Sequence, residues 1–250
     1  MSETKSDTPN VRSLPSYIVP SIVAGVVIAV ATVVYFAIMY FSGNHMLGSA
    51  IFSIGLMFVF LFRADLFTGR VSSIYADVST KKIKPLRALS VLSIILAFNI
   101  VGAVIFLGLY ALSQPYDGII AVVQNVVNTR TELSFGVIFV RGFLCNMFIC
   151  SATYFSMRYK DKPGVAMAAI LICVFPFMIL GFEHSIVNFF VAPLAVFLGV
   201  SAATGPTLLW LLSSLLGNLV GGLLIAALYL SKKMSTLEEE RTQSDITTTE

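Results

Sequence analysis

Six long apolar stretches constrain this chain more than any other feature of its sequence. The hydrocarbon core of a membrane is about 30 Å thick, and a helix needs about 20 apolar residues to cross it. Each stretch is at least that long. We therefore predict an all-α integral membrane protein with six transmembrane helices, at residues 18–41, 47–78, 88–112, 135–157, 165–198 and 208–230.

The composition excludes most classes of soluble protein. Hydrophobic residues make up 57% of the 250 residues and charged residues only 12%, against about 25% charged residues in a typical globular chain. A net charge of +3 is too small to indicate nucleic-acid binding. The three cysteines lie in apolar stretches without the paired spacing of a zinc or disulfide site. We expect no metal and no cofactor.

Lysine and arginine are distributed unevenly over the connections between these stretches. Seven of them lie in the connections 79–87 and 158–164, whereas the connections 42–46, 113–134 and 200–207 contain Arg130 alone. Cytoplasmic loops carry the excess of positive charge. Both termini are therefore expected in the cytoplasm, as a short N-terminal segment at 1–14 and a disordered tail at 231–250.

Two of the six stretches are longer than one crossing needs and carry charge in the middle. The second contains Arg63 and Asp65, and the fifth contains Glu183 and His184. A charge at bilayer depth costs about 2.5–3.5 kcal/mol on insertion scales, so it usually faces a cavity or an opposite charge. Nearby Gly and Pro residues predict helices that stop, turn and restart, which requires protein or water to satisfy the freed backbone. The alternative is an unbroken tilted helix with a buried ion pair.

A short motif recurs in the third and sixth stretches. Asn99-Ile100-Val101-Gly102 lies 34 residues after Asp65, and Asn218-Leu219-Val220-Gly221 lies 35 residues after Glu183. Two glycines repeat the spacing ahead of the acidic residues, at 40 and 41 residues: Gly25 and Gly142. The shared spacing indicates an internal duplication.

Three crossings followed by three crossings place the two halves in opposite orientations. The channel domain at 15–230 then consists of two inverted three-helix repeats, 15–112 and 135–230, and the interrupted helices mark the permeation site. Asn99 and Asn218 either cap the broken helices or contact the substrate, and capping is the favoured interpretation.

These residues resemble the formate/nitrite transporter family, which also includes hydrosulfide channels. The resemblance covers about residues 15–230 and implies an aquaporin-like protomer, a pore through each protomer and a homopentamer. We expect it in a bacterial cytoplasmic (inner) membrane. Its motifs are Phe52-Ser53-Ile54-Gly55-Leu56, Ala64-Asp65-Leu66-Phe67-Thr68, Asn99-Ile100-Val101-Gly102 and Gly181-Phe182-Glu183-His184-Ser185-Ile186-Val187-Asn188.

The resemblance also implies a role for individual pore residues. Leu66, Phe67 and Thr68 would form the loop near the cytoplasmic constriction. Leu56 and Ile149 would narrow the pore there. The opposite constriction would be formed by Phe52 and Phe177, and the chamber between the two would hold His184 with the polar neighbours Thr68 and Asn146.

Apolar constrictions with a histidine between them suit a small weak acid. Rings of Leu and Phe exclude hydrated ions by dewetting, and His changes charge near its unperturbed pKa of about 6.5. We therefore expect protons and a small monovalent anion as partners, with formate first and nitrite, hydrosulfide and lactate as alternatives. Glu183 is either the partner of His184 or a cap of the broken helix, which is favoured.

Two arginines depart from the formate-channel pattern. Arg63 and Arg141 lie at membrane positions where small or uncharged residues are usual. They either pair with Asp65 or Glu183, which is favoured, or add positive potential that attracts anions.

Two other functional classes fit less well. An aquaporin-like facilitator of neutral solutes would normally show paired Asn-Pro-Ala triplets, and the sequence has none. An enzyme would need a cluster of metal ligands or a nucleophile beside a base. We predict a channel or transporter without catalytic residues.

Overall fold

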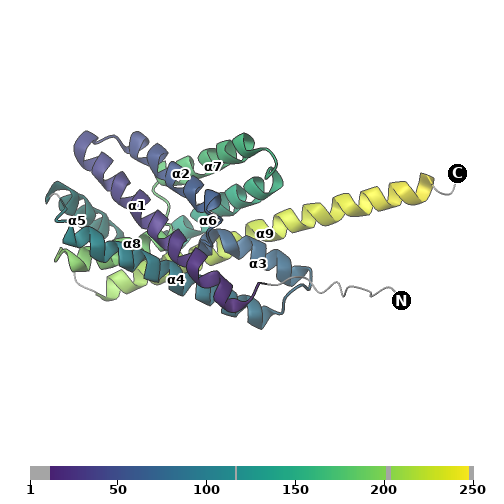
Figure 1. Ribbon diagram of the computed structural model, residues 1–250, viewed down its shortest axis with the longest axis horizontal. Coiled ribbons are helices and arrows are strands. Elements are labelled where there is room, and N and C mark those ends of the chain that lie inside the picture. Colours follow the sequence, from purple (N-terminus) through teal and green to yellow (C-terminus); the bar gives the residue numbers. More distant parts are fainter. Residues whose placement is uncertain (1–11, 116, 201–203, 248–250) are drawn as a thin grey trace.

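A computed structural model describes residues 12–115, 117–200 and 204–247, with side chains placed up to residue 231. The described part is helical throughout, in agreement with the predicted all-α class (Figure 1). A 3₁₀ helix, η1, spans Leu14–Tyr17. The α-helices are α1 (Ile18–Ser42), α2 (His45–Leu61), α3 (Phe67–Ser79), α4 (Pro85–Leu112), α5 (Asp117–Thr131), α6 (Phe135–Arg158), α7 (Pro163–Ile179), α8 (Ser185–Phe197) and α9 (Gly205–Thr247).

Four of these helices are long and apolar enough to cross a membrane: α1, α4, α6 and the part of α9 up to Ser231. The helices α2, α7 and α8 are apolar but shorter. Many large apolar side chains are exposed along the long helices, as expected for surfaces that face lipid or other apolar partners.

The second and fifth predicted stretches each contain two helices. Residues 62–66 separate α2 from α3, and residues 180–184 separate α7 from α8. Each separation includes a residue with left-handed backbone, Arg63 at φ 50° and Gly181 at φ 66°. Glycine adopts this conformation at little cost, whereas arginine rarely does.

The helices pack in two matching sets. α1 lies along α4, and α6 lies along α9. A Cβ atom on Gly102 would collide with the carbonyl group of Ile22, and one on Gly221 with that of Phe143. Glycine is therefore required where these helix pairs approach most closely. The short helices cross over: α3 packs on α6 and α9, and α8 packs on α1 and α4.

Two segments differ from their sequence predictions. The connection 113–134 contains α5, whose residues Ile119, Val123 and Val127 are buried at four-residue spacing against the bundle.

The prediction of a disordered tail at 231–250 was wrong for residues 231–247, because α9 continues through Thr247 (Figure 1). Residues 231–247 include many good helix formers and contain neither Gly nor Pro, and extending an existing helix avoids the cost of nucleation. Residues 248–250, and residues 1–11 of the predicted N-terminal segment, lie outside the described part.

Candidate functional site

Asn99 satisfies three backbone groups around the interruption between α2 and α3. Its side-chain oxygen accepts a hydrogen bond from the N–H of Phe67 at 2.8 Å. Its side-chain nitrogen donates to the carbonyl groups of Asp65 and Ser21, both at 2.8 Å. Helix α3 therefore begins at an amide supplied by α4, because Leu66, the residue before α3, provides no side-chain cap.

Asn218 repeats this arrangement around the interruption between α7 and α8. Its oxygen accepts from the N–H of Ser185, and its nitrogen donates to the carbonyl groups of Glu183 and Gly142, all at 2.8 Å. Both asparagines are fully buried. The two side chains act as caps, which was the favoured interpretation.

The hydrogen bonds also show which positions correspond between the two halves. Gly142 takes the place of Ser21, because each supplies the carbonyl group that the capping asparagine reaches from the preceding long helix. Gly25 instead lies against the carbonyl group of Asn99. The predicted match of Gly25 with Gly142 was therefore wrong, although their spacings agree.

His184 and Thr68 meet between the two interruptions. The Nε2 atom of His184 lies 3.1 Å from Oγ1 of Thr68, and both residues are buried. The Nδ1 atom of His184 accepts from the N–H of Val187 at 3.3 Å and so caps α8. A neutral imidazole that accepts through Nδ1 carries its proton on Nε2. Nε2 then donates toward Thr68.

Asn146, the third predicted chamber residue, is held by α9 of its own half of the chain. Its Nδ2 atom donates to the carbonyl group of Asn218 at 2.5 Å. Its Oδ1 atom is buried and has no hydrogen-bond partner in the described part of the chain. Asn146 therefore keeps one acceptor free.

Two groups of apolar side chains accompany the contact of His184 with Thr68. The rings of Phe52 and Phe177 are perpendicular with centroids 6.2 Å apart, and Phe177 stacks on His184 at 6.1 Å. Leu56, Leu66 and Ile149 line a second region, so the predicted constriction residues form two groups. Phe67 packs in the same apolar core and lines neither of the two cavities described below.

Each apolar group borders a cavity. The cavity on the Phe52 side, here the histidine cavity, has a volume of about 90 Å³ and is lined by Phe52, His184, Glu183, Arg130 and His45 among others. The cavity on the leucine side, here the leucine cavity, has a volume of about 50 Å³ and is lined by Leu56, Val59, Phe60, Ala64, Leu66, Gly69, Arg70, Ile149 and Thr153.

Glu183 is held by groups other than His184. Its carboxylate pairs with Nε of Arg130 at 2.6 Å and accepts from Trp210 at 2.9 Å and Asn188 at 3.0 Å. Arg130 and Trp210 were not predicted as site residues from the sequence. Arg130 did carry a signal, because it is the lone basic residue in the three connections that are otherwise free of Lys and Arg.

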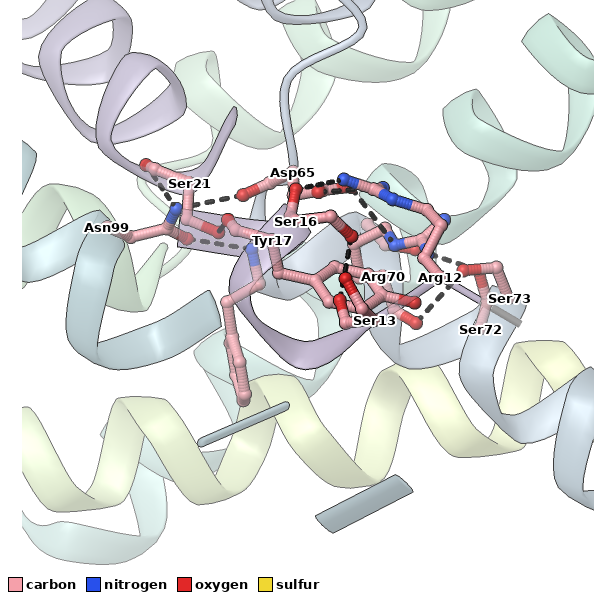
Figure 2. A network of polar contacts seen from close by, with 12 residues as sticks. Arg12, Ser13, Ser16, Tyr17, Ser21, Asp65, Arg70, Ser72, Ser73 and Asn99 are labelled. Carbon is pink, nitrogen blue, oxygen red and sulfur yellow. Dashed lines mark hydrogen bonds and ion pairs between the residues drawn. The ribbon is translucent and has the colours of Figure 1, made fainter. Parts of the chain in front are cut away.

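Asp65 is held by two arginines. Its carboxylate pairs with Arg12 at 2.9 Å and with Arg70 at 3.4 Å (Figure 2). The guanidinium group of Arg12 also lies 4.2 Å above the ring of Tyr17. Figure 2 shows how this network ties the start of the described chain to the loop before α3.

The predicted pairing of Arg63 or Arg141 with these carboxylates was wrong. Arg63 is exposed in its left-handed turn, and Arg141 contributes its carbonyl group, which accepts from the N–H of Glu183 at 3.3 Å. The partners that the structure provides come from the N-terminal segment, from α3 and from α5, none of which had been assigned such a role.

The side chains that the structure describes include no group of three or more His, Cys, Asp or Glu residues arranged to hold a metal ion.

Comparison with known proteins places this geometry in context. The sequence profile described as "Formate/nitrite transporter" matches residues 2–231. The uncharacterized transporter YrhG of Bacillus subtilis (strain 168) is 30% identical over 190 residues, which cover 73% of this chain and 69% of that protein. A formate-nitrite transporter of Plasmodium falciparum (isolate 3D7) is 31% identical over 206 residues, which cover 78% of this chain and 66% of that protein.

Solved structures share the fold. A chain described as an "FNT family ion channel" superposes with a TM-score of 0.80 at 24% identity, covering 87% of this chain and 90% of that one. A "Pentameric formate channel with formate bound" superposes with a TM-score of 0.77 at 19% identity, covering 88% of this chain and 97% of that one. The chain spans about two thirds of the length of the curated relatives named above. By the extent of the profile match and by these relatives, the chain belongs to the formate/nitrite transporter family.

Proposed function

We propose that this protein is a channel or proton-linked transporter for small monovalent anions, with formate as the leading substrate. The observation that carries the proposal is the buried contact of His184 with Thr68. The Phe52–Phe177 pair packs against His184, and Leu56, Leu66 and Ile149 line a separate cavity. A related protein of Methanothermobacter thermautotrophicus, 29% identical over 198 residues, is described as a "Probable formate transporter".

The proposed path runs through the protomer from one cavity to the other. An anion would leave water in the histidine cavity, which Phe52 and His184 both line, and pass Phe52 and Phe177. It would then contact Thr68 and Asn146 before the leucine group. The apolar groups exclude a hydrated ion by dewetting. A weak acid that gains a proton, or accepts a hydrogen bond from Nε2 of His184, would cross as a neutral or nearly neutral species.

The proposed membrane arrangement has six crossings. Helices α2 and α3 together form the second crossing, and α7 and α8 together form the fifth, each interrupted near the bilayer midplane. Asn99 and Asn218 make matching hydrogen bonds, and each short helix packs on long helices of the other half: α3 on α6 and α9, and α8 on α1 and α4. These features support two inverted repeats, 15–112 and 135–230.

The proposed assembly is a homopentamer with a pore in each protomer, in a bacterial cytoplasmic membrane. The pentameric formate channel that superposes on this chain supports the assembly. Both termini would lie in the cytoplasm, which agrees with the charge distribution over the connections. Residues 15–230 would form the channel domain.

Solute flux into proteoliposomes tests the proposal. Formate, nitrite, hydrosulfide, lactate and glycerol are compared between pH 5 and 8. We expect formate flux that rises as pH falls, with glycerol excluded. Flux of nitrite, hydrosulfide or lactate without formate flux would assign a different anion as the substrate and leave the family unchanged. Glycerol flux without anion flux would contradict the anion pathway.

A further inference from the structure

His45, the first residue of α2, belongs to none of the family motifs, yet it lines the histidine cavity together with Arg130 and Glu183. Its ring is perpendicular to that of Tyr35, with centroids 5.9 Å apart. Within the described part of the chain, the imidazole makes no hydrogen bond and no ion pair. Both ring nitrogens are therefore free to take up a proton or to donate to a ligand.

The histidine cavity runs from the end of the bundle into its interior. His45 is half-buried and directly follows the exposed residues 41–44, whereas Phe52 and His184 are buried. Helix α5, which carries Arg130, lies at the end of the bundle opposite the extended part of α9 (Figure 1). An anion that enters the cavity from this end therefore meets His45 before it reaches His184.

The other titratable residues that line the cavity leave it without net charge near neutral pH. Arg130 and Glu183 pair at 2.6 Å and cancel each other. His184 accepts a hydrogen bond through Nδ1, so its ring is neutral, and the phenol of Tyr35 keeps its proton in this range. The helices that pack on α2, namely α1 and α7, contain no Asp, Glu, Lys or Arg. Among the described lining residues, protonation of His45 is thus what gives the cavity a net positive charge.

We propose that His45 captures a small monovalent anion at the mouth of the histidine cavity when it is protonated, and that its neutral form does not. The proposal deepens the proposed function and rests on it. A cleft with net positive charge raises the local concentration of anions, and a charged imidazole donates hydrogen bonds through both nitrogens. Because histidine changes charge between pH 5 and 8, anions are captured more strongly from this face in acid.

This role differs from the one proposed for His184. His45 acts on the first encounter with the anion and so sets the formate concentration for half-maximal flux. His184 lies deeper, at the contact with Thr68, and acts on the passage itself. At saturating formate, variants of His45 are therefore expected to keep the wild-type dependence of flux on pH.

Formate flux from the face opposite the two termini tests the role of His45. The full-length protein and its His45→Gln and His45→Lys variants are placed in sided membrane vesicles with the same pH on both sides. The formate concentration for half-maximal flux is then measured at pH 5 and at pH 8, on either side of the range in which histidine titrates.

The two variants are expected to act in opposite directions. His45→Gln should raise the half-maximal concentration about three-fold or more at pH 5 and leave it unchanged at pH 8, because the wild type carries the extra charge only in acid. His45→Lys should leave it unchanged at pH 5 and lower it about three-fold or more at pH 8, because lysine stays charged over this range. Both differences should shrink at high ionic strength, where the attraction is screened.

Asn125→Lys is the matched control for the added charge. Asn125 is an exposed residue of α5 that does not line the histidine cavity, so the variant adds a positive charge at the same end of the bundle without touching the site. We expect its half-maximal concentration to equal that of the wild type at both pH values.

Each variant is checked for assembly by size-exclusion chromatography, and either one alone decides the question if the other fails to assemble. The proposal is overturned if the assembled variants match the wild type at both pH values. It is also overturned if Asn125→Lys lowers the half-maximal concentration at pH 8 as much as His45→Lys does. A wild-type protein that moves none of the tested anions contradicts the proposed function instead.

Discussion

Asn99 and Asn218 each form three hydrogen bonds to backbone groups through one side chain. An asparagine can do this because its amide offers an acceptor and two donors on a short stem. The hydrogen bonds that each forms, all at 2.8 Å, join the start of a short helix, the end of the loop before it and a neighbouring long helix. The residues that interrupt the apolar helices therefore depend on residues more than 30 positions away.

Removing one of these caps should destabilise the fold. Asn99→Leu keeps the approximate side-chain size but removes the hydrogen-bond partner of the buried Phe67 N–H and of the Asp65 carbonyl group, each worth about 1–3 kcal/mol. It also removes the second hydrogen bond of the Ser21 carbonyl group, which lies inside α1. We expect a clearly lower thermal unfolding temperature of the detergent-solubilised protein, and the same for Asn218→Leu. Asn125→Leu, at an exposed position of α5, should change little. Equal unfolding temperatures for all three variants would contradict the capping role.

His184 has two contacts of different kinds, and substitutions can separate them. Nδ1 caps α8, and Nε2 reaches Thr68. His184→Asn retains an oxygen that can cap the helix but cannot take up a proton near neutral pH. We expect the variant to assemble normally and to lose the dependence of formate flux on pH between 5 and 8. His184→Ala should alter the flux in the same way with lower stability. Flux identical to wild type at every pH would exclude the proposed role of this histidine.

At the scale of whole elements, contact between helices depends on the small residues between them. Gly102 faces the carbonyl group of Ile22 on α1, whereas a Cβ atom on Gly108, six residues later on the same helix, would meet no other described atom within 4 Å. Gly→Ala within a helix otherwise gains about 1 kcal/mol in helix propensity. The same substitution, Gly→Ala, is therefore expected to have opposite effects on stability at these two positions.

Gly102→Ala should separate α1 from α4 and lower the unfolding temperature, because the added methyl group meets backbone atoms that cannot rotate away. Gly108→Ala should leave the unfolding temperature unchanged or raise it. The comparison by thermal unfolding needs no assay of transport. A stabilising effect of Gly102→Ala would mean that the close approach of α1 and α4 is not needed for stability.

The sequence located the interruptions of the apolar stretches but not every helix. Charge beside Gly and Pro predicted that regular structure would stop near Asp65 and Glu183, and α2 and α7 end four residues before these positions. Helix α5 was missed because its apolar residues form a narrow stripe at four-residue spacing within a polar segment. Its burial depends on α1 and α8, which supply the surface it covers.

At the scale of the molecule, the last helix extends well beyond the bundle (Figure 1). α9 runs to Thr247, whereas the part suited to a membrane ends at Ser231. The extension projects away from the two cavities and the packed helix pairs. A chain that ends at residue 231 should therefore assemble and carry formate at the wild-type rate, as measured by size-exclusion chromatography and proteoliposome flux. Loss of assembly on truncation would assign a structural role to the extension.

The membrane class, the positions of the interruptions and the family motifs could be inferred from the sequence, because each depends on local composition and spacing. Tertiary structure alone decided which charges meet. Arg12 pairs with Asp65 across 53 positions, and Arg130 reaches Glu183 from a helix that the sequence did not reveal. The sequence favoured Arg63 and Arg141 as partners because both are charged residues within the predicted membrane stretches. Ion pairs instead follow distance in space, and only the packing of α3, α5 and the N-terminal segment against the bundle sets those distances.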